Sequence, residues 1–322
     1  MRNLRASWRG LARAIVFGFA VAGGAAASAE SPKPAVTAPR PSPYVPPGYQ
    51  YVFGDEFDGA ALDTTKWWTR YVYDGDKGPG TLDFLKDEQQ RYRENGNHVV
   101  KGGVLNLVAR AVGSGFESGM IRSRTTMMYG YFEMRVKMPK AKGVFPAGWL
   151  NPSQAPGQKL IWPPEIDIFE FVNNGKEELP NMVHSNIVVG DDGSQGGQFL
   201  YADRDFNKQW YYWRAPFNFS DDFHVFAALW DTDDTVSFFI DGKLIQKRAY
   251  RWTNPGGMPG YAHVLLNLAV GGAWAGKFGI DRDAFPQALE VDYVRVYQKP
   301  DRIMLGEDRR GTEVLCRPAE SC

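Results

Sequence analysis

Three carboxylates crowd into the six-residue segment "EIDIFE", which begins at Glu165 and reads as a β-strand. Successive side chains of a strand point to opposite faces, so Glu165 and Asp167 share one face and the isoleucines beside them share the other. Glu170 follows Asp167 by three residues, so strict alternation would place it on the apolar face. A β-bulge near Ile168 and Phe169 would insert one residue and return Glu170 to the face of the other two acids. We therefore predict a bulge at this point.

Two carboxylates held close together, with a third between them, suit hydrolysis of a glycosidic bond with retention of configuration. One must be ionised to attack the anomeric carbon, and the other must be protonated to give a proton to the leaving oxygen. Crowded acids cannot all ionise, so the group as a whole holds the protons. The competing interpretation is a solvated edge strand whose acids face water. Repulsion between like charges on one face and the apolar flanking sequence favour the catalytic interpretation.

The chain around these acids is predicted to be all-β. Six further segments show the alternation or the apolar runs typical of strands: 104–110, 131–138, 223–230, 236–245, 264–270 and 289–297. Asp241-Gly242 predicts a tight hairpin turn. No segment shows sustained helical periodicity with capping residues. Strands separated by glycine-rich turns predict a β-sandwich.

The N-terminus reads as a targeting segment. Four arginines without acids precede an apolar run rich in small residues, and Ala27-Ser28-Ala29 has the form that signal peptidase cleaves. A transmembrane anchor is the alternative, but the run is short and rich in Gly and Ala. We predict a secreted or periplasmic protein with these parts: a signal peptide at 1–29, a proline-rich linker at 30–48, a catalytic domain at 49–298 and a tail at 299–322.

Charge and cysteine content indicate which partners and which cellular environment to expect. Removal of the predicted signal peptide would leave 33 Lys and Arg against 37 Asp and Glu, without the basic footprint of a nucleic-acid-binding protein. We expect a monomer with no nucleic-acid partner and, in the mature form, no membrane partner. The two cysteines, Cys316 and Cys322, lie in the tail and are predicted to form one disulfide in an exported protein.

The segment at 165–170 resembles the ExDxxE signature of glycoside hydrolase family 16, in the bulged form of laminarinases, agarases and carrageenases. The resemblance covers roughly residues 50–298 and includes these blocks: "FGDEFDG" (53–59), "DEQQRY" (87–92), "SGMIRS" (118–123), "YGYFEMRVKMP" (129–139), "GVFPAGWL" (143–150), "NLAVGGAWAG" (267–276) and "VDYVRVYQ" (291–298). In the second block Asp87 stands where the family often has asparagine, which bears on a contact to a bound sugar.

The resemblance implies a jelly-roll sandwich of two antiparallel sheets, with a concave substrate cleft. It implies that Glu165 is the nucleophile, Asp167 the assisting acid and Glu170 the general acid/base. It also implies that Trp149 lines the cleft near the cleaved bond. No cofactor is expected for catalysis. Family members often carry a structural calcium ion, and the matching positions here are Glu56, the Gly103 carbonyl and Asp292; hydrogen bonding of these acids between strands is the alternative.

Four further side chains are candidates for substrate contact. Trp162 and Trp274 either stack on sugar rings or belong to the core. Arg135 lies on the polar face of its strand, where it could bind sugar hydroxyls or simply meet solvent. His184 follows the acidic strand by 14 residues, so it could contact Glu170 or the substrate, or serve as a packed structural residue.

The sequence therefore predicts a secreted endo-acting glycosidase that cleaves a β-linked polysaccharide, a β-1,3- or β-1,3-1,4-glucan, with retention. A depolymerase of a galactan or a bacterial exopolysaccharide is the alternative within the enzymes. A non-catalytic carbohydrate-binding module on the same fold is the alternative from another class. Such modules typically lose one of the two glutamates, and here both remain. Loops 71–88 and 187–222 are expected to set specificity.

Overall fold

The computed structural model describes residues 39, 42–74, 82–153, 160–190, 194–202, 205–252, 260–309 and 312–316, without the side chains of 201–202, 307–309 and 312–316. The predicted signal peptide and the partner Cys322 of the predicted disulfide lie outside these residues. No helix of the described part is long and apolar enough to cross a membrane.

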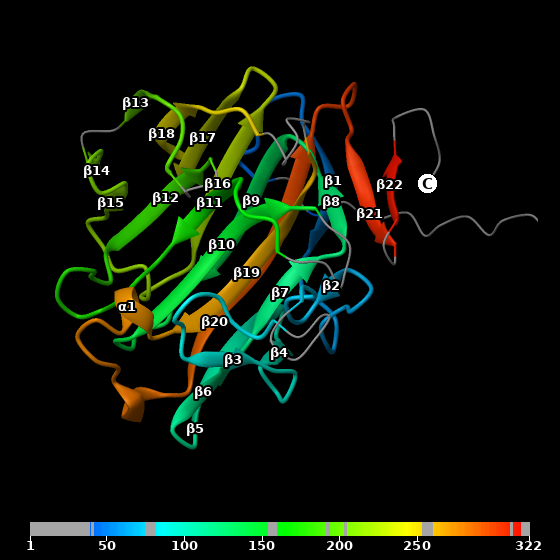
Figure 1. Cartoon of the computed structure of the whole chain (residues 1–322). Helices are drawn as coiled ribbons and strands as arrows, with labels where there is room; N and C mark the ends of the chain where they lie inside the picture. The colour runs from blue at the N-terminus through cyan, green and yellow to red at the C-terminus, as the bar shows by residue number, and fades with distance from the viewer. Residues whose placement is uncertain are drawn as a thin grey trace, which may run out of the picture. The chain divides into compact units, whose positions relative to one another are not determined.

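Two mostly antiparallel sheets form the compact unit, which confirms the predicted sandwich (Figure 1). The first sheet runs in the order β13 (Phe199–Ala202), β18 (Lys243–Ala249), β17 (Thr235–Ile240), β16 (His224–Asp231), β9 (Gly130–Lys137), β20 (Gln287–Gln298), β5 (Val104–Val112), β6 (Gly115–Ser118) and β3 (Gln90–Tyr92). In addition, β1 (Gln50–Asp55) pairs with β20, and β4 (His98–Lys101) pairs with β5.

The second sheet carries the three acids. Its order is β14 (Phe206–Asn207), β15 (Tyr212–Arg214), β12 (Met182–Val188), β11 (Glu165–Glu170), β10 (Val144–Pro152), β19 (Ala262–Val270), β8 (Thr125–Met127), β21 (Leu305–Arg309) and β22 (Thr312–Cys316). Strand β7 (Met120–Ser123) pairs with β19 and with β2 (Trp67–Trp68). The described helices are short: α1 (Gly272–Ala275) and the 3₁₀ helix η1 (Arg282–Ala284).

The core lies between the two sheets. Apolar side chains of one sheet pack against those of the other; the rings of Phe169 on β11 and Phe226 on β16, for example, have centroids 4.9 Å apart. The predicted hairpin is also present. Asp241 and Gly242 join β17 to β18 with φ angles of 49° and 76°, the left-handed pair that a two-residue hairpin turn requires.

Segments on both sides of the predicted catalytic domain pack against it. Ser42, within the predicted linker, is buried and its hydroxyl donates a hydrogen bond of 2.7 Å to the buried Glu133 carboxylate on β9. At the other end, β21 falls in the predicted tail and pairs with β8. The folded unit therefore extends beyond residues 49–298 in both directions.

The predicted bulge is present in β11. On the β10 side, Gly148 pairs with Phe169 and Trp149 with Asp167, which leaves Ile168 without a partner. On the β12 side, the register likewise shifts by one residue between Asp167 and Glu170. The extra residue brings all three acids to the cleft face, while the apolar side chains of β11 stay buried between the sheets.

The residue opposite the bulge has no room for a side chain. A Cβ atom on Gly148 would lie 2.4 Å from Cε1 of Phe169 and 2.7 Å from the sulfur of Met134. Replacing Gly148 with alanine should lower the free energy of unfolding by about 1–3 kcal/mol, the usual cost of overpacking a core. Urea unfolding of Gly148→Ala measures this.

Gly115→Ala provides the matched control. A Cβ atom there would meet its nearest neighbour, a backbone oxygen, at 3.8 Å, so stability should change little. Equal stability of the two variants would contradict the close approach at the bulge.

Candidate active site

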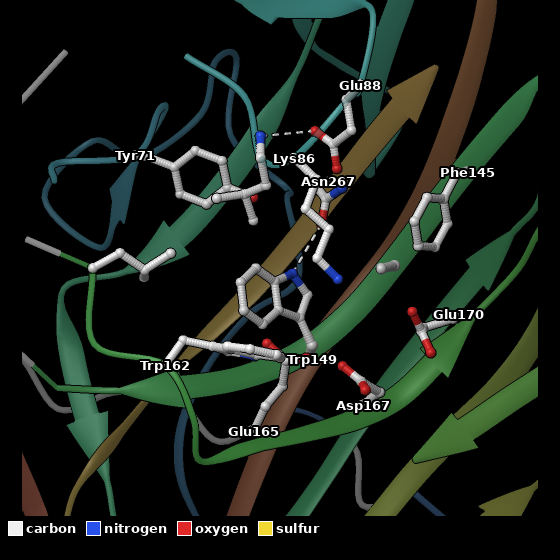
Figure 2. A pocket seen from close by; sticks show the side chains of 13 residues that line it. Tyr71, Lys86, Glu88, Phe145, Trp149, Trp162, Glu165, Asp167, Glu170 and Asn267 are labelled. Atoms are coloured by element: carbon white, nitrogen blue, oxygen red, sulfur yellow. Dashed lines mark hydrogen bonds between the residues drawn. The ribbon is translucent and has the colours of Figure 1, made fainter. Parts of the chain in front are cut away.

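A cleft of about 320 Å³ opens on the second sheet above β10, β11 and β19. Such a volume lies at the lower end of the range for small-molecule sites, enough for part of a polymer chain. Figure 2 shows the three acids in a row along β11, with Trp162 beside Glu165 and Phe145 on the side of Glu170. The remaining lining residues are Tyr71, Leu85, Lys86, Glu88, Ala147, Trp149, Leu160 and Asn267.

Hydrogen bonds hold the three acids in distinct ways. Glu165 is hydrogen-bonded to the Trp162 side chain and to Asp167, and both hydrogen bonds lower the pKa of Glu165. Glu170 accepts a 2.8 Å hydrogen bond from Nδ2 of Asn186, which lies on the neighbouring strand β12. Asp167 is thus hydrogen-bonded to Glu165, whereas Glu170 is held by Asn186.

Burial makes the ionised form of each acid unfavourable. Burial, followed by the charge of Glu170, raises the pKa of Glu165 to about 8. Burial and the charges of both glutamates raise the pKa of Asp167 well above its usual range. Burial also raises the pKa of Glu170, although the nearby His184 and the hydrogen bond from Asn186 oppose this. The acids therefore titrate as a group that keeps protons at neutral pH.

Trp149 lies where the resemblance implied, in the cleft lining. Its indole nitrogen donates a 2.9 Å hydrogen bond to Oδ1 of Asn267 on β19, and Nδ2 of Asn267 donates to the Tyr92 hydroxyl at 3.1 Å. The ring is only 5% exposed. It therefore presents a fixed apolar surface beside Asp167.

Trp162 is a wall of the cleft rather than a core residue. Its side chain is 39% exposed, and the Lys86 ammonium lies 5.5 Å from its ring centroid. Because the residue is exposed and its side chain is hydrogen-bonded to Glu165, the ring can stack on a sugar held next to that acid.

Sequence reasoning missed Lys86. It is the only cation among the described residues that line the cleft, and its charge lowers the pKa of all three acids. Its side chain points into the cleft in Figure 2. The backbone at Lys86 is left-handed, with φ of 49°, and the next residue is anchored because Asp87 accepts a 2.6 Å hydrogen bond from the Ala273 N–H. Asp87 thus anchors the loop and does not line the cleft.

Tyr71, Glu88, Phe145 and Asn267 were not singled out as site residues either. Glu88, Phe145 and Asn267 lie inside the sequence blocks at 87–92, 143–150 and 267–276, and Tyr71 begins one of the loops expected to set specificity. The sequence blocks could therefore have identified three of these four residues as candidates for the site.

His184 and Trp274 lie beside the cleft and are not among its lining residues. His184 pairs with Glu170 across the β11–β12 ladder, and its ring is 4.9 Å from that of Trp274 in an edge-on contact. Trp274 in turn lies edge-on to Phe145, which does line the cleft. Both residues thus contact residues that line the cleft.

Arg135 is not a substrate contact, and that prediction is wrong. It lies on β9, in the sheet that does not carry the acids, where its guanidinium pairs with Asp292 at 2.7 Å and covers the Phe223 ring. Alternation along the strand correctly predicted a polar face, but this face belongs to the first sheet.

The calcium site predicted at Glu56, Gly103 and Asp292 does not fit the donors present. Both oxygens of Glu56 accept hydrogen bonds of 2.7 Å from Arg295, and Asp292 is paired with Arg135. Guanidinium groups therefore already neutralise both carboxylates that a cation would need. Among the described residues no cluster of three or more His, Cys, Asp or Glu side chains could hold a metal ion.

The raised pKa of Glu165 predicts a pH-dependent cost in stability. Between its usual pKa near 4.5 and the folded value of about 8, the unfolded chain ionises this group while the folded protein keeps the proton, so stability falls as pH rises. Glu165→Gln keeps an acceptor for Trp162 but removes the charge. We expect its unfolding temperature to exceed that of the unmodified protein by about 2–4 °C at pH 8, if the gain is about 1 kcal/mol, and by much less at pH 4.5.

Thermal unfolding at both pH values measures this difference. Glu177→Gln is the control, because that carboxylate is exposed and paired with Lys277 at the surface, so its effect should be small at either pH. A gain for Glu165→Gln that is no larger at pH 8 than at pH 4.5 would contradict the cost of burying this acid.

The chain is similar to known proteins over most of its length. A family model described as the GH16 domain of β-porphyranases A–D matches residues 50–299. The β-glucanase of Rhodothermus marinus is 32% identical over 272 residues, which cover 78% of this chain and 86% of that protein. Glucan endo-1,3-β-glucosidase A1 of Niallia circulans is 28% identical over 279 residues, 78% of this chain but only 38% of that longer protein.

A solved structure supports the same relationship. The laminarinase from Rhodothermus marinus superposes with a TM-score of 0.58 at 31% sequence identity, over 78% of this chain and 97% of that one. The family model covers most of the chain, and the Rhodothermus relatives match over most of their length. The chain is therefore a glycosidase that belongs to glycoside hydrolase family 16.

Proposed function

We propose that this glycosidase cuts internal bonds of a β-linked polysaccharide by double displacement with retention, and that its preferred substrate is a β-1,3- or mixed β-1,3-1,4-glucan. The observation that carries the proposal is the placement of Glu165, Asp167 and Glu170 on one face of β11. We further propose that the protein is exported, on the strength of the signal-peptide pattern at 1–29.

In the first step Glu165 attacks the anomeric carbon, and Glu170 gives its proton to the leaving oxygen as the glycosidic bond breaks. Hydrogen bonds from Trp162 and Asp167 favour the ionised form of Glu165. A bound sugar chain excludes water from Glu170 and offers it the leaving oxygen, which favours its protonated form. The positive charge that develops at the anomeric carbon further stabilises the Glu165 carboxylate.

In the second step the Glu170 carboxylate takes a proton from water, and the hydroxide so formed attacks the anomeric carbon and releases Glu165. Asp167 keeps its proton throughout and donates it as a hydrogen bond to Glu165. Asp167 orients Glu165 and stabilises the negative charge of Glu165 once the glycosyl group has left it.

Endo-acting cleavage is supported by apolar surfaces on both sides of the acids. Trp162 lies beside Glu165, and Phe145, backed by Trp274, lies on the side of Glu170 (Figure 2). Rings on both sides can hold sugar units before and after the cleaved bond. A carbohydrate-binding module would need neither the bulge nor the proton-sharing acids.

Variants of the acids test the mechanism. Glu165→Ala should lose hydrolysis because no covalent intermediate can form, and added azide should yield a glycosyl azide of inverted configuration. Glu170→Ala should lose about 10²–10⁴-fold with the polysaccharide, but an aryl glycoside with a good leaving group should still react, and azide should then give the retained product. NMR of the products distinguishes the two.

Asp167→Asn is the matched control and should lower the rate less than either glutamate change. Near-normal hydrolysis by Glu165→Ala on the preferred substrate would overturn the assignment of the nucleophile.

Comparison of polysaccharides tests the substrate. We expect kcat/KM for laminarin or mixed-linkage β-glucan to exceed that for agarose, porphyran and carrageenan by about tenfold or more, since each mispaired hydroxyl costs about 1 kcal/mol or more. Oligosaccharides of several lengths should appear early, as internal cleavage requires. The galactan alternative is favoured by the porphyranase domain that matches residues 50–299. A higher kcat/KM on porphyran or agarose would establish that alternative.

A further inference from the structure

The imidazole of His184 faces a carboxylate oxygen and a backbone carbonyl oxygen. Its Nε2 lies 2.9 Å from Oε2 of Glu178, and its Nδ1 lies 3.2 Å from the backbone carbonyl oxygen of Trp210. The ring is buried, with 5% of the residue exposed, so water cannot readily replace either partner. A carbonyl has no proton, and an ionised carboxylate has none either.

A neutral imidazole has one nitrogen that donates and one that accepts. In either tautomer of neutral His184, one nitrogen lone pair would therefore point at an oxygen lone pair. Both contacts are hydrogen bonds only when both nitrogens carry protons. We propose that His184 is an imidazolium cation in the folded protein and acts as a fixed positive charge beside Glu170, the acid/base of the proposed reaction.

The partner of this cation is itself firmly held. The second oxygen of Glu178, Oε1, accepts a 3.0 Å hydrogen bond from the Trp274 indole nitrogen. The buried Asn174 accepts hydrogen bonds from the backbone N–H groups of the three residues up to and including Glu178. Both oxygens of the Glu178 carboxylate thus have a hydrogen-bonding partner, which fixes the position of the carboxylate beside the His184 ring.

Among the described groups around His184, only carboxylates carry a charge opposite to that of an imidazolium. Strand β11 brings Glu170 opposite it, β15 contributes the edge of the Tyr212 ring at 5.8 Å, and α1 contributes Trp274. The loop before β12 contributes Glu178, and the cation Lys86 lines the cleft together with Glu170. His184 therefore lies between two carboxylates, one that fixes it and one that it influences.

This arrangement fits the double task of Glu170. The residue must release a proton in the first step and take one from water in the second, so its affinity for the proton has to stay moderate. Burial raises the pKa of Glu170, and the charge of His184 opposes that rise. His184 is on this account a positioning residue that keeps Glu170 able to return to its carboxylate form.

Histidine ¹⁵N NMR tests the cation directly, and it does so independently of the proposed reaction. At pH 7.5 both ring nitrogens of His184 should give the shifts of protonated nitrogens, and the signal should be missing in His184→Gln. His263 serves as an internal control. Its Nδ1 faces the Ser123 carbonyl, and burial holds its pKa well below the usual value, so it should show one unprotonated nitrogen. An unprotonated nitrogen on His184 at this pH would overturn the proposal.

Glu178→Gln tests the effect on Glu170, and this part rests on the proposed function. Without the carboxylate, His184 should lose its second proton. Glu170 should then hold its proton more tightly, because the charge of His184 affects the pKa of Glu170 more strongly than the opposing charge of Glu178 does. We expect the alkaline limb of the kcat/KM profile to move up by about one pH unit. With 2,4-dinitrophenyl β-laminaribioside, kcat and KM should fall together by about tenfold, because only the second step is slowed.

Glu177→Gln, one residue away on the same loop, is the matched control, since Glu177 pairs with Lys277 at the surface. It should leave the profile and both constants unchanged. A Glu178→Gln profile identical to that of the unmodified protein would overturn the link between His184 and Glu170, even if NMR finds the cation. A neutral His184 together with an intact retaining mechanism would overturn the inference and leave the proposed function standing.

Discussion

The placement of one extra residue in β11 governs the site. A pleated strand sends every second side chain to the same face, so an acid three residues after another would enter the apolar interior. An isolated carboxylate there would cost several kcal/mol or would stay permanently protonated. The bulge at Ile168 avoids this outcome and leaves Phe169 directed at Phe226 of the other sheet. The close approach at Gly148 follows from the same displacement, because the bulged strand brings the Phe169 ring over that position.

The cleft then has to accommodate three desolvated carboxylates. Burial raises the pKa of each acid. Trp162 opposes this rise for Glu165, Asn186 and His184 oppose it for Glu170, and Lys86 opposes it for all three. No single donor or cation neutralises the group. Burying three carboxylates destabilises the folded protein. The extensive apolar packing between the sheets offsets this cost.

Much of this could be predicted from the sequence, because local rules decide it. The spacing of Glu165, Asp167 and Glu170 already required a bulge, and the Asp241-Gly242 pair already required a hairpin turn. Alternation along 131–138 correctly separated polar from apolar faces, but it carries no information on which sheet a polar face belongs to, and Arg135 was misplaced for that reason. The predicted calcium ligands failed for a related reason. Arg295 and Arg135 reach Glu56 and Asp292 from other positions in the fold, and strand patterns do not reveal such partners.

The position of Lys86 in the cleft could not be predicted from the sequence, for a different reason. Its direction depends on a left-handed backbone and on the anchoring of Asp87 by Ala273, 186 residues later in the chain. His184 lies on β12, the strand next to the acids. Its charge state, however, depends on a carboxylate from the preceding loop and a carbonyl from a distant one. Such long-range polar contacts are set by tertiary structure alone.

The pairing of β1 with β20 has a consequence for how the protein is made. Among the strands that the structure describes, β1 pairs with β20, the last long one, and Glu56 meets its partner Arg295 across 239 residues. At ribosomal speeds of about 5–20 residues per second, β1 waits on the order of 10–50 s for that partner to be synthesised. During this time the first sheet cannot be complete, and exposed strand edges invite pairing with other chains. A polypeptide that must stay unfolded to cross a membrane, as proposed here, would gain from a topology that postpones folding until its last strands arrive.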